Sequence, residues 1–188
     1  MPQPIADSVA DLVGNTPLVR LRVDDDAAEG VRLLAKLESV NPLSSIKDRA
    51  ALFMLRAAEE CGELRPGGTV VEATSGNTGI ALAALAAARG HRCVIVLPDS
   101  ATAERIALLR ALGAEVVRTP RDAGYPGAIA RAEEIHAATP GSWFTCQHEN
   151  QDNVRAHYET TGPEIWADTG GRVDVLVCGV GTGGTLTG

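Results

Sequence analysis

A single lysine stands at the start of a predicted helix, in the stretch Asn41–Arg49 (NPLSSIKDR). Ser45, with Asp48 three residues later, gives a variant of the capping box that begins a helix. Good helix formers follow, and Gly62 predicts the helix end. Lys47 is therefore expected in the first turn, where unpaired N–H groups and the helix dipole create a positive potential. Because this potential lowers the pKa of an amine, it favours a nucleophile that forms an imine with an aldehyde.

Two loops of small residues each follow a predicted strand and precede a helix. The loop Thr74–Gly79 (TSGNTG) brings N–H groups to a helix N-terminus, which suits a carboxylate, and its Asn77 can both donate and accept. The loop Gly179–Thr185 (GVGTGGT) forms an N–H nest suited to a phosphate. The second loop also matches G-x-G-x-x-G, but a dinucleotide site fits poorly because that fingerprint belongs in a first βαβ unit. It is not a Walker loop, since no Gly-Lys-Ser/Thr follows.

These three features together are what pyridoxal 5′-phosphate and an amino-acid substrate require. Taken singly they have plain alternatives, because most lysines are solvated and Gly and Asn are common in ordinary turns. In combination, the aldehyde of the cofactor would bind Lys47, its phosphate the second glycine loop, and the substrate carboxylate the Asn77 loop. The cofactor would supply the electron sink and the protein the orientation.

Strands and helices alternate along the chain. Short strands are expected at 18–21 and 31–37, on either side of an acidic turn at 24–26, and the Lys47 helix follows them. Apolar strands are predicted at 69–73, 93–97, 115–117, 143–145 and 173–178. Helices are predicted from the end of the Thr74–Gly79 loop to residue 89 and at 104–112, 128–138 and 154–167. The pair Gly162-Pro163 should interrupt the last of these helices. This pattern predicts an α/β fold with a parallel sheet covered on both faces. Such sheets bind ligands at the carboxyl ends of their strands, where both loops fall.

Composition and charge further limit the classes of partner and site that the chain can have. Hydrophobic content of 45% and charged content of 22% are typical of a soluble globular protein. The net charge of −7 argues against nucleic acid or an anionic membrane as partner. We found no membrane-length apolar run and no signal-peptide pattern at the start of the chain, so we expect a cytoplasmic protein. The cysteines and histidines lack metal-ligand spacing, so we expect no metal site and free buried thiols at Cys61, Cys93, Cys146 and Cys178.

Six segments spread over almost the whole chain resemble one known family. They are GNTPLVRL, LESVNPLSSIKDRAA, EATSGNTGIALA, ALGAEVVRTP, HYETTGPEIW and GVGTGGTLTG. In this order they resemble cysteine synthase (O-acetylserine sulfhydrylase), one of the fold-type II pyridoxal-phosphate enzymes. The resemblance implies replacement of the acetate of O-acetylserine by sulfide, and a homodimer that can bind serine acetyltransferase.

The resemblance also assigns roles to residues. It implies that Lys47 is the Schiff-base lysine and the acid/base for the substrate Cα proton, and that Asn77 hydrogen-bonds the cofactor's ring hydroxyl. The residues implied to hold the phosphate are Gly181, Thr182, Gly183, Gly184 and Thr185. Those implied to bind the substrate carboxylate are Thr74, Ser75, Gly76, Thr78 and Gln147.

By the same resemblance the chain divides into three parts. Residues 1–40 would be N-terminal strands associating with a larger domain, 41–145 a smaller α/β domain, and 146–188 the start of the larger domain, which is incomplete. The sequence departs from the family pattern at 148–153, where an aromatic residue and a proline are usual, and at 101–103. These departures leave open cystathionine β-synthase or another β-substituted alanine synthase. A shortened, non-catalytic family member that binds the acyltransferase is a further alternative.

Overall fold

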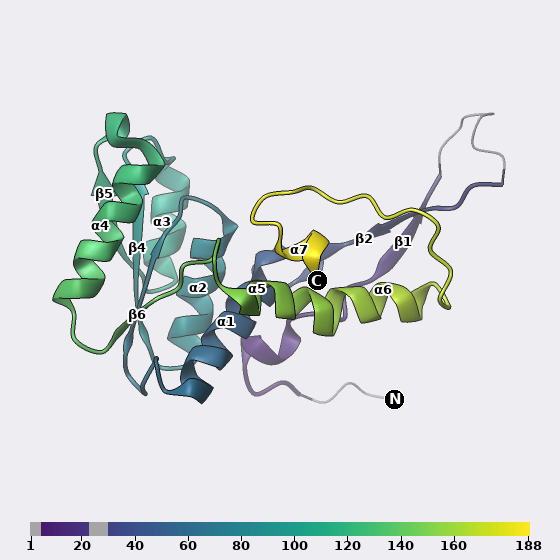
Figure 1. Cartoon of the computed structure of the whole chain (residues 1–188), viewed down its shortest axis with the longest axis horizontal. Helices are drawn as coiled ribbons and strands as arrows, with labels where there is room; N and C mark the ends of the chain where they lie inside the picture. The colour runs from purple at the N-terminus through teal and green to yellow at the C-terminus, as the bar shows by residue number, and fades with distance from the viewer. Residues whose placement is uncertain (1–4, 23–29) are drawn as a thin grey trace.

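A parallel four-stranded sheet forms one end of the molecule. The computed structural model describes residues 5–22 and 30–188, and the acidic turn predicted at 24–26 lies outside these ranges (Figure 1). The strands lie in the order β5-β4-β3-β6 and every pairing is parallel. Their bounds are β3 Thr69–Ala73, β4 Arg92–Pro98, β5 Glu115–Thr119 and β6 Ser142–Phe144. The α/β class predicted from the sequence is therefore confirmed.

Helices cover both faces of this sheet. On one face lie α1 (Lys47–Cys61) and α2 (Asn77–Ala88), with α3 (Ala103–Ala111) beside them, and on the other face lies α4 (Gly124–Ala138). Successive side chains of β3 point to opposite faces, so Val70 joins the core under α1 and α2 while Val71 packs under α4. This explains why the strands are apolar in nearly every position. The helix α4 begins four positions before the predicted residue 128.

A helical run and a two-stranded ribbon form the other end (Figure 1). The strands β1 (Leu18–Leu21) and β2 (Leu33–Lys36) pair antiparallel beside α5 (Gln151–Ala156), the π-helical turn η5 (His157–Thr161) and α6 (Gly162–Asp168). Short 3₁₀ helices occupy Val9–Leu12, Glu38–Val40 and Arg121–Ala123 (η1, η3 and η4), and α7 spans Gly184–Thr187. The division of the chain at residues 40 and 145 stays a prediction.

Two sequence predictions are wrong in this region. The Gly162-Pro163 pair does not interrupt the helix, because a π-helical turn precedes it and Pro163 sits in the first turn of α6, where no N–H is needed. The segment 173–178 is not a strand, although its residues are apolar. Val175 and Val177 are 77% and 89% exposed, and the segment pairs with no strand among the described residues. A strand requires a neighbour for its N–H and C=O groups, and here none adjoins it.

A buried ion network joins the two ends. Arg49 of α1 is 1% exposed and donates to Glu38 at 2.8 Å and to Glu164 of α6 at 2.6 Å. Lys36 of β2 lies 2.9 Å from the same Glu164. The hydrogen bonds from Arg49 and Lys36 outweigh the cost of burial and lower the pKa of Glu164 to about 2. The network therefore fixes α1, and with it Lys47, against the ribbon and α6.

Candidate functional site

Lys47 is the first residue of α1 and is half-buried. The helix begins one residue later than the predicted cap implies, with Ile46 as the N-cap, although the Ser45 hydroxyl still accepts from the Lys47 N–H at 3.1 Å. The Asp48 carboxylate accepts from the Leu43 N–H at 2.6 Å instead of closing a capping box. Burial lowers the pKa of Lys47, which gives the expected direction but from desolvation rather than from the helix dipole.

The sequence contains one other lysine, Lys36, and its surroundings are opposite in kind. Its ammonium lies 2.9 Å from Glu164 and 3.3 Å from Asp168, and it donates to the Thr16 carbonyl at 2.6 Å. Lys36 is thus engaged in ion pairs and a hydrogen bond. Lys47 has no carboxylate within salt-bridge distance among the described residues. The structure thus distinguishes the two lysines chemically.

The predicted carboxylate loop lies at the carboxyl end of β3. Thr78 donates to the Gln147 side-chain oxygen at 2.6 Å, and both residues are buried. Two of the predicted carboxylate-binding residues, far apart in the sequence, are therefore in direct contact. Ser75 and Asn77 are exposed instead, and the hydroxyl of Thr74 accepts from the Gly76 N–H at 3.2 Å. The carbonyl of Ser75 accepts from Arg105.

The second glycine loop begins α7. Gly183 takes φ +85°, a left-handed conformation that favours glycine, and caps the helix. The Thr182 hydroxyl accepts from the Gly184 N–H at 3.3 Å, and the Thr185 hydroxyl lies 3.3 Å from a ring nitrogen of His157. A Cβ built on Gly181 would meet nothing within 4 Å, so open space lies in front of the loop. With N–H groups, hydroxyls and no acidic side chain, the loop fits a phosphate.

The segment α5–η5 brings these parts together. Asn153 donates to the Gln147 carbonyl at 3.0 Å and to the Thr182 hydroxyl at 2.9 Å. His157, one helical turn later, contacts Thr185 and hydrogen-bonds Thr161 at 2.9 Å. Sequence reasoning missed both residues. The signal that could have found them is their spacing of four, which places two polar side chains on one face of a helix.

His157 is buried and uncharged. Burial, and then the positive charges of Lys47 and Arg49, lower its pKa to about 4. At neutral pH the ring is therefore neutral, with one nitrogen donating and the other accepting. A neutral ring can hold the Thr185 hydroxyl without adding a charge beside the lysine. The π-helical turn that carries His157 is a local irregularity that occurs often at functional sites.

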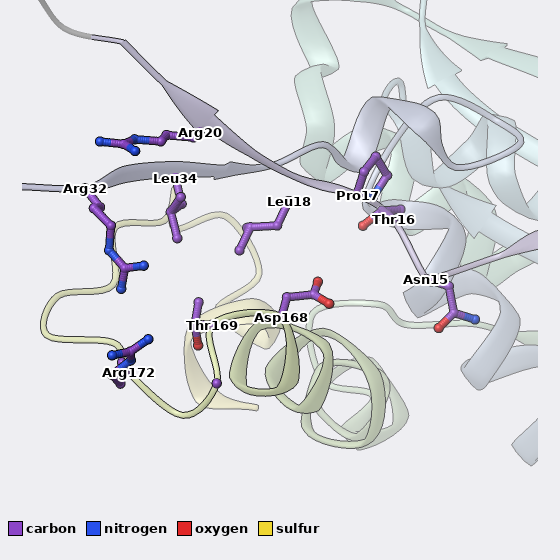
Figure 2. Close-up of a pocket in the computed structure, with 11 residues that line it drawn as sticks. Asn15, Thr16, Pro17, Leu18, Arg20, Arg32, Leu34, Asp168, Thr169 and Arg172 are labelled. Atoms are coloured by element: carbon purple, nitrogen blue, oxygen red, sulfur yellow. The ribbon is translucent and has the colours of Figure 1, made fainter.

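A separate pocket lies between the β1–β2 ribbon and the end of α6 (Figure 2). It has a volume of about 620 Å³, and Arg32 and Arg172 point toward each other across it. None of the predicted site residues lines it. Its lining comprises Asn15, Thr16, Pro17, Leu18, Arg20, Arg32, Leu34, Asp168, Thr169, Gly170 and Arg172.

Residues 5–22 and 30–188 include no group of three or more His, Cys, Asp or Glu placed to hold a metal ion. Among the same residues, no helix is long and apolar enough to cross a membrane. The four cysteines are free, but Cys93 alone is fully buried and Cys61 is exposed, so the prediction of buried thiols was wrong for Cys61.

Comparison with known proteins places this arrangement in a family. The sequence model of the pyridoxal-phosphate dependent enzymes matches residues 9–188. Cysteine synthase A of Escherichia coli (strain K12) is 51% identical over 94% of this chain and 54% of its own, and cysteine synthase B of Pseudomonas aeruginosa is 47% identical over 96% and 60%. The crystal structure of O-ureido-L-serine synthase superimposes with a TM-score of 0.91 at 44% identity, covering 97% of this chain and 57% of that one. The chain thus spans little more than half the length of these relatives.

Proposed function

Because the chain belongs to the pyridoxal-phosphate dependent enzymes, we propose that it binds pyridoxal 5′-phosphate through Lys47 and acts on an α-amino acid. The observation that carries the proposal is the convergence on α5–η5 of three parts: α1, which begins with Lys47, Gln147 with its partner Thr78, and the glycine loop. When bound, the cofactor supplies an electron sink for a carbanion at the substrate Cα. The protein supplies the groups that hold and orient the reactants.

Lys47 has two roles in this proposal. Its amine, made less basic by burial, would hold the aldehyde group of the cofactor. The same amine would also take the proton from the substrate Cα. Arg49, two residues along α1, fixes the helix through Glu38 and Glu164 and so limits the movement of this amine.

We assign the cofactor phosphate and the substrate carboxylate to two different sets of polar residues. The N–H groups and hydroxyls of 181–185 hold the phosphate, and Thr74–Thr78 with Gln147 hold the substrate carboxylate. Because Gln147 accepts from Thr78 through its side-chain oxygen, its NH₂ group remains to donate to the carboxylate. Asn77 is exposed at the start of α2 and is free to turn toward the cofactor ring.

The reaction we propose is replacement of a substituent at Cβ, giving L-cysteine from O-acetyl-L-serine and sulfide. The relatives named cysteine synthase, at 47% and 51% identity, support this choice. A second candidate is the same replacement with another nucleophile. The TM-score of 0.91 to O-ureido-L-serine synthase favours this second candidate. A protein with the same fold is named for a different product, so the fold alone does not determine the nucleophile. The homodimer, the serine acetyltransferase partner and the cytoplasmic location stay predictions.

A chimera tests the proposed function. Residues 1–188 would be joined to the part of E. coli cysteine synthase A that this chain does not match. With pyridoxal 5′-phosphate, O-acetyl-L-serine and sulfide, the chimera should form cysteine, and a chimera with Lys47→Ala should not. The control is Lys36→Arg, which keeps the charge beside Glu164 and should retain most of the turnover. Equal turnover with and without Lys47 would overturn the proposal.

A further inference from the structure

Asn153 occupies an unusual position between the two anion-binding parts of the site. It is 3% exposed, and its NH₂ group donates to two acceptors, the Gln147 carbonyl at 3.0 Å and the Thr182 hydroxyl at 2.9 Å. A carbonyl can only accept, so the NH₂ must face Gln147. The side-chain oxygen has no hydrogen-bond partner among the described residues. It lies over Gly184, where an added Cβ would come within 2.4 Å of it.

The bond to Thr182 determines what that hydroxyl can do. Its oxygen accepts from the Asn153 amide and also from the Gly184 N–H at 3.3 Å. A hydroxyl has two acceptor lone pairs, and both are then used. Neither bond uses its proton, which is therefore available to an anion in the loop. Without Asn153, the hydroxyl could rotate and lose this arrangement.

The other bond fixes the Gln147 peptide. The Gln147 carbonyl accepts from Asn153, and its N–H donates to the buried Glu72 carboxyl at 3.4 Å. With the backbone held on both sides, the side chain of Gln147 is directed at Thr78. One buried amide thus connects Gln147, the partner of the carboxylate loop, to Thr182 of the phosphate loop.

We propose that Asn153 is a positioning residue that couples the phosphate-binding loop 180–185 to the carboxylate-binding residue Gln147. This inference rests on the proposed function for the identity of the two anions. The coupling itself rests on the two hydrogen bonds. Movement of Thr182 would be transmitted to Gln147 through a single rigid side chain, so that the two anion sites keep one separation and orientation.

Hydrogen exchange on the ligand-free 188-residue chain tests the coupling. Thr182→Val removes the acceptor without altering α5, and it should raise amide exchange at 146–149 several-fold as well as at 180–185. Asn153→Ala, which removes both N–H groups and adds no charge, should raise exchange at the same two segments. The matched control is Arg155→Gln, which alters an exposed side chain of the same helix whose partners, Asp152 and Glu159, lie outside both segments, and it should change exchange in neither. Changes confined to 180–185 in Thr182→Val would overturn the proposal.

Cofactor binding provides the second readout. Asn153→Ala, which adds no charge beside the phosphate, should lower the affinity for pyridoxal 5′-phosphate by about tenfold, the usual effect of one hydrogen bond to a charged group. The affinity for pyridoxal, which lacks the phosphate, should not change. In a Thr182→Val background, Asn153→Ala should have no further effect, because Asn153 acts on the phosphate through Thr182. An additive loss, or an equal loss for pyridoxal, would contradict a positioning role.

The two readouts separate this inference from the proposed function. If wild-type protein binds neither pyridoxal nor its phosphate, the proposed function fails, while the exchange results still decide the coupling. If both bind and exchange at 146–149 does not respond to Thr182→Val, the coupling fails alone.

Discussion

At the scale of single residues, Gly183 and Asn77 should contribute differently to cofactor binding. Gly183 has φ +85° inside the phosphate loop, so Gly183→Asp adds backbone strain and sets a carboxylate against the phosphate. We expect this variant to lose the cofactor. Asn77 is exposed and is proposed to contact only the cofactor ring, so Asn77→Ala should retain the cofactor but turn over slowly. Equilibrium dialysis against pyridoxal 5′-phosphate measures both, and equal occupancy in the two variants would refute this division of roles.

Glu72 should make stability depend on pH. It is 2% exposed in β3, and burial raises its pKa to about 7 from the ordinary 4.5. A raised carboxyl pKa contributes stability at low pH, and that contribution is lost as the pH rises from about 4.5 through about 7. Asp48, with a pKa raised to about 6 by burial, adds to the same trend. The urea midpoint should therefore decrease as the pH rises from about 4.5 to about 7, and Glu72→Gln should flatten that decrease. An unchanged slope would remove Glu72 as its cause.

At the scale of elements, the Arg49 network should hold the ribbon and α6 to α1. Arg49→Met leaves the partly buried Glu38 without an ion-pair partner and leaves Glu164 with Lys36 alone, which should cost about 3 kcal/mol. Urea unfolding measures this cost. The control is Arg131→Ala, which breaks an exposed pair with Glu134 and should cost less than about 1 kcal/mol.

The same network predicts acid sensitivity. The pKa of Glu164 is lowered to about 2 from 4.5, so its contribution is present above about pH 4.5 and is lost as the pH falls toward 2. Wild-type stability should fall over this range, and Arg49→Met should show a smaller fall. Equal acid sensitivity of the two proteins would assign the effect to other carboxylates.

Local patterns predicted most elements because they depend on neighbours in sequence. The bounds of β3 and the end of α1 at Gly62 agree with the prediction, since burial on both faces and a left-handed glycine leave direct signals. The segment 173–178 carries the same apolar signal but forms no strand, because pairing depends on a neighbour that sequence pattern does not reveal. For the same reason Asn153 and His157 were missed, since their roles arise from contacts with residues more than 25 positions away.

At the scale of the whole molecule, the exposed apolar surface should determine how strongly the chain aggregates. Val175, Leu176 and Val177 are 77%, 57% and 89% exposed, and unpaired apolar segments tend to pair with other chains. We predict that residues 1–188 alone aggregate, bind the cofactor weakly and form negligible cysteine beside the chimera. Light scattering follows the aggregation. Val175→Lys with Val177→Lys should reduce it without changing the melting temperature, and unchanged aggregation would point to another surface.

The claim on which the account depends is that Lys47 is the amine that binds the cofactor. The chain offers a decisive comparison, because its one other lysine, Lys36, is paired with Glu164 and Asp168. The protein would be incubated with pyridoxal 5′-phosphate, reduced with borohydride and digested, and the labelled peptides identified by mass spectrometry. We predict the pyridoxyl group on Lys47, with Lys36 unlabelled. Label on Lys36, or equal label on both lysines, would contradict the account.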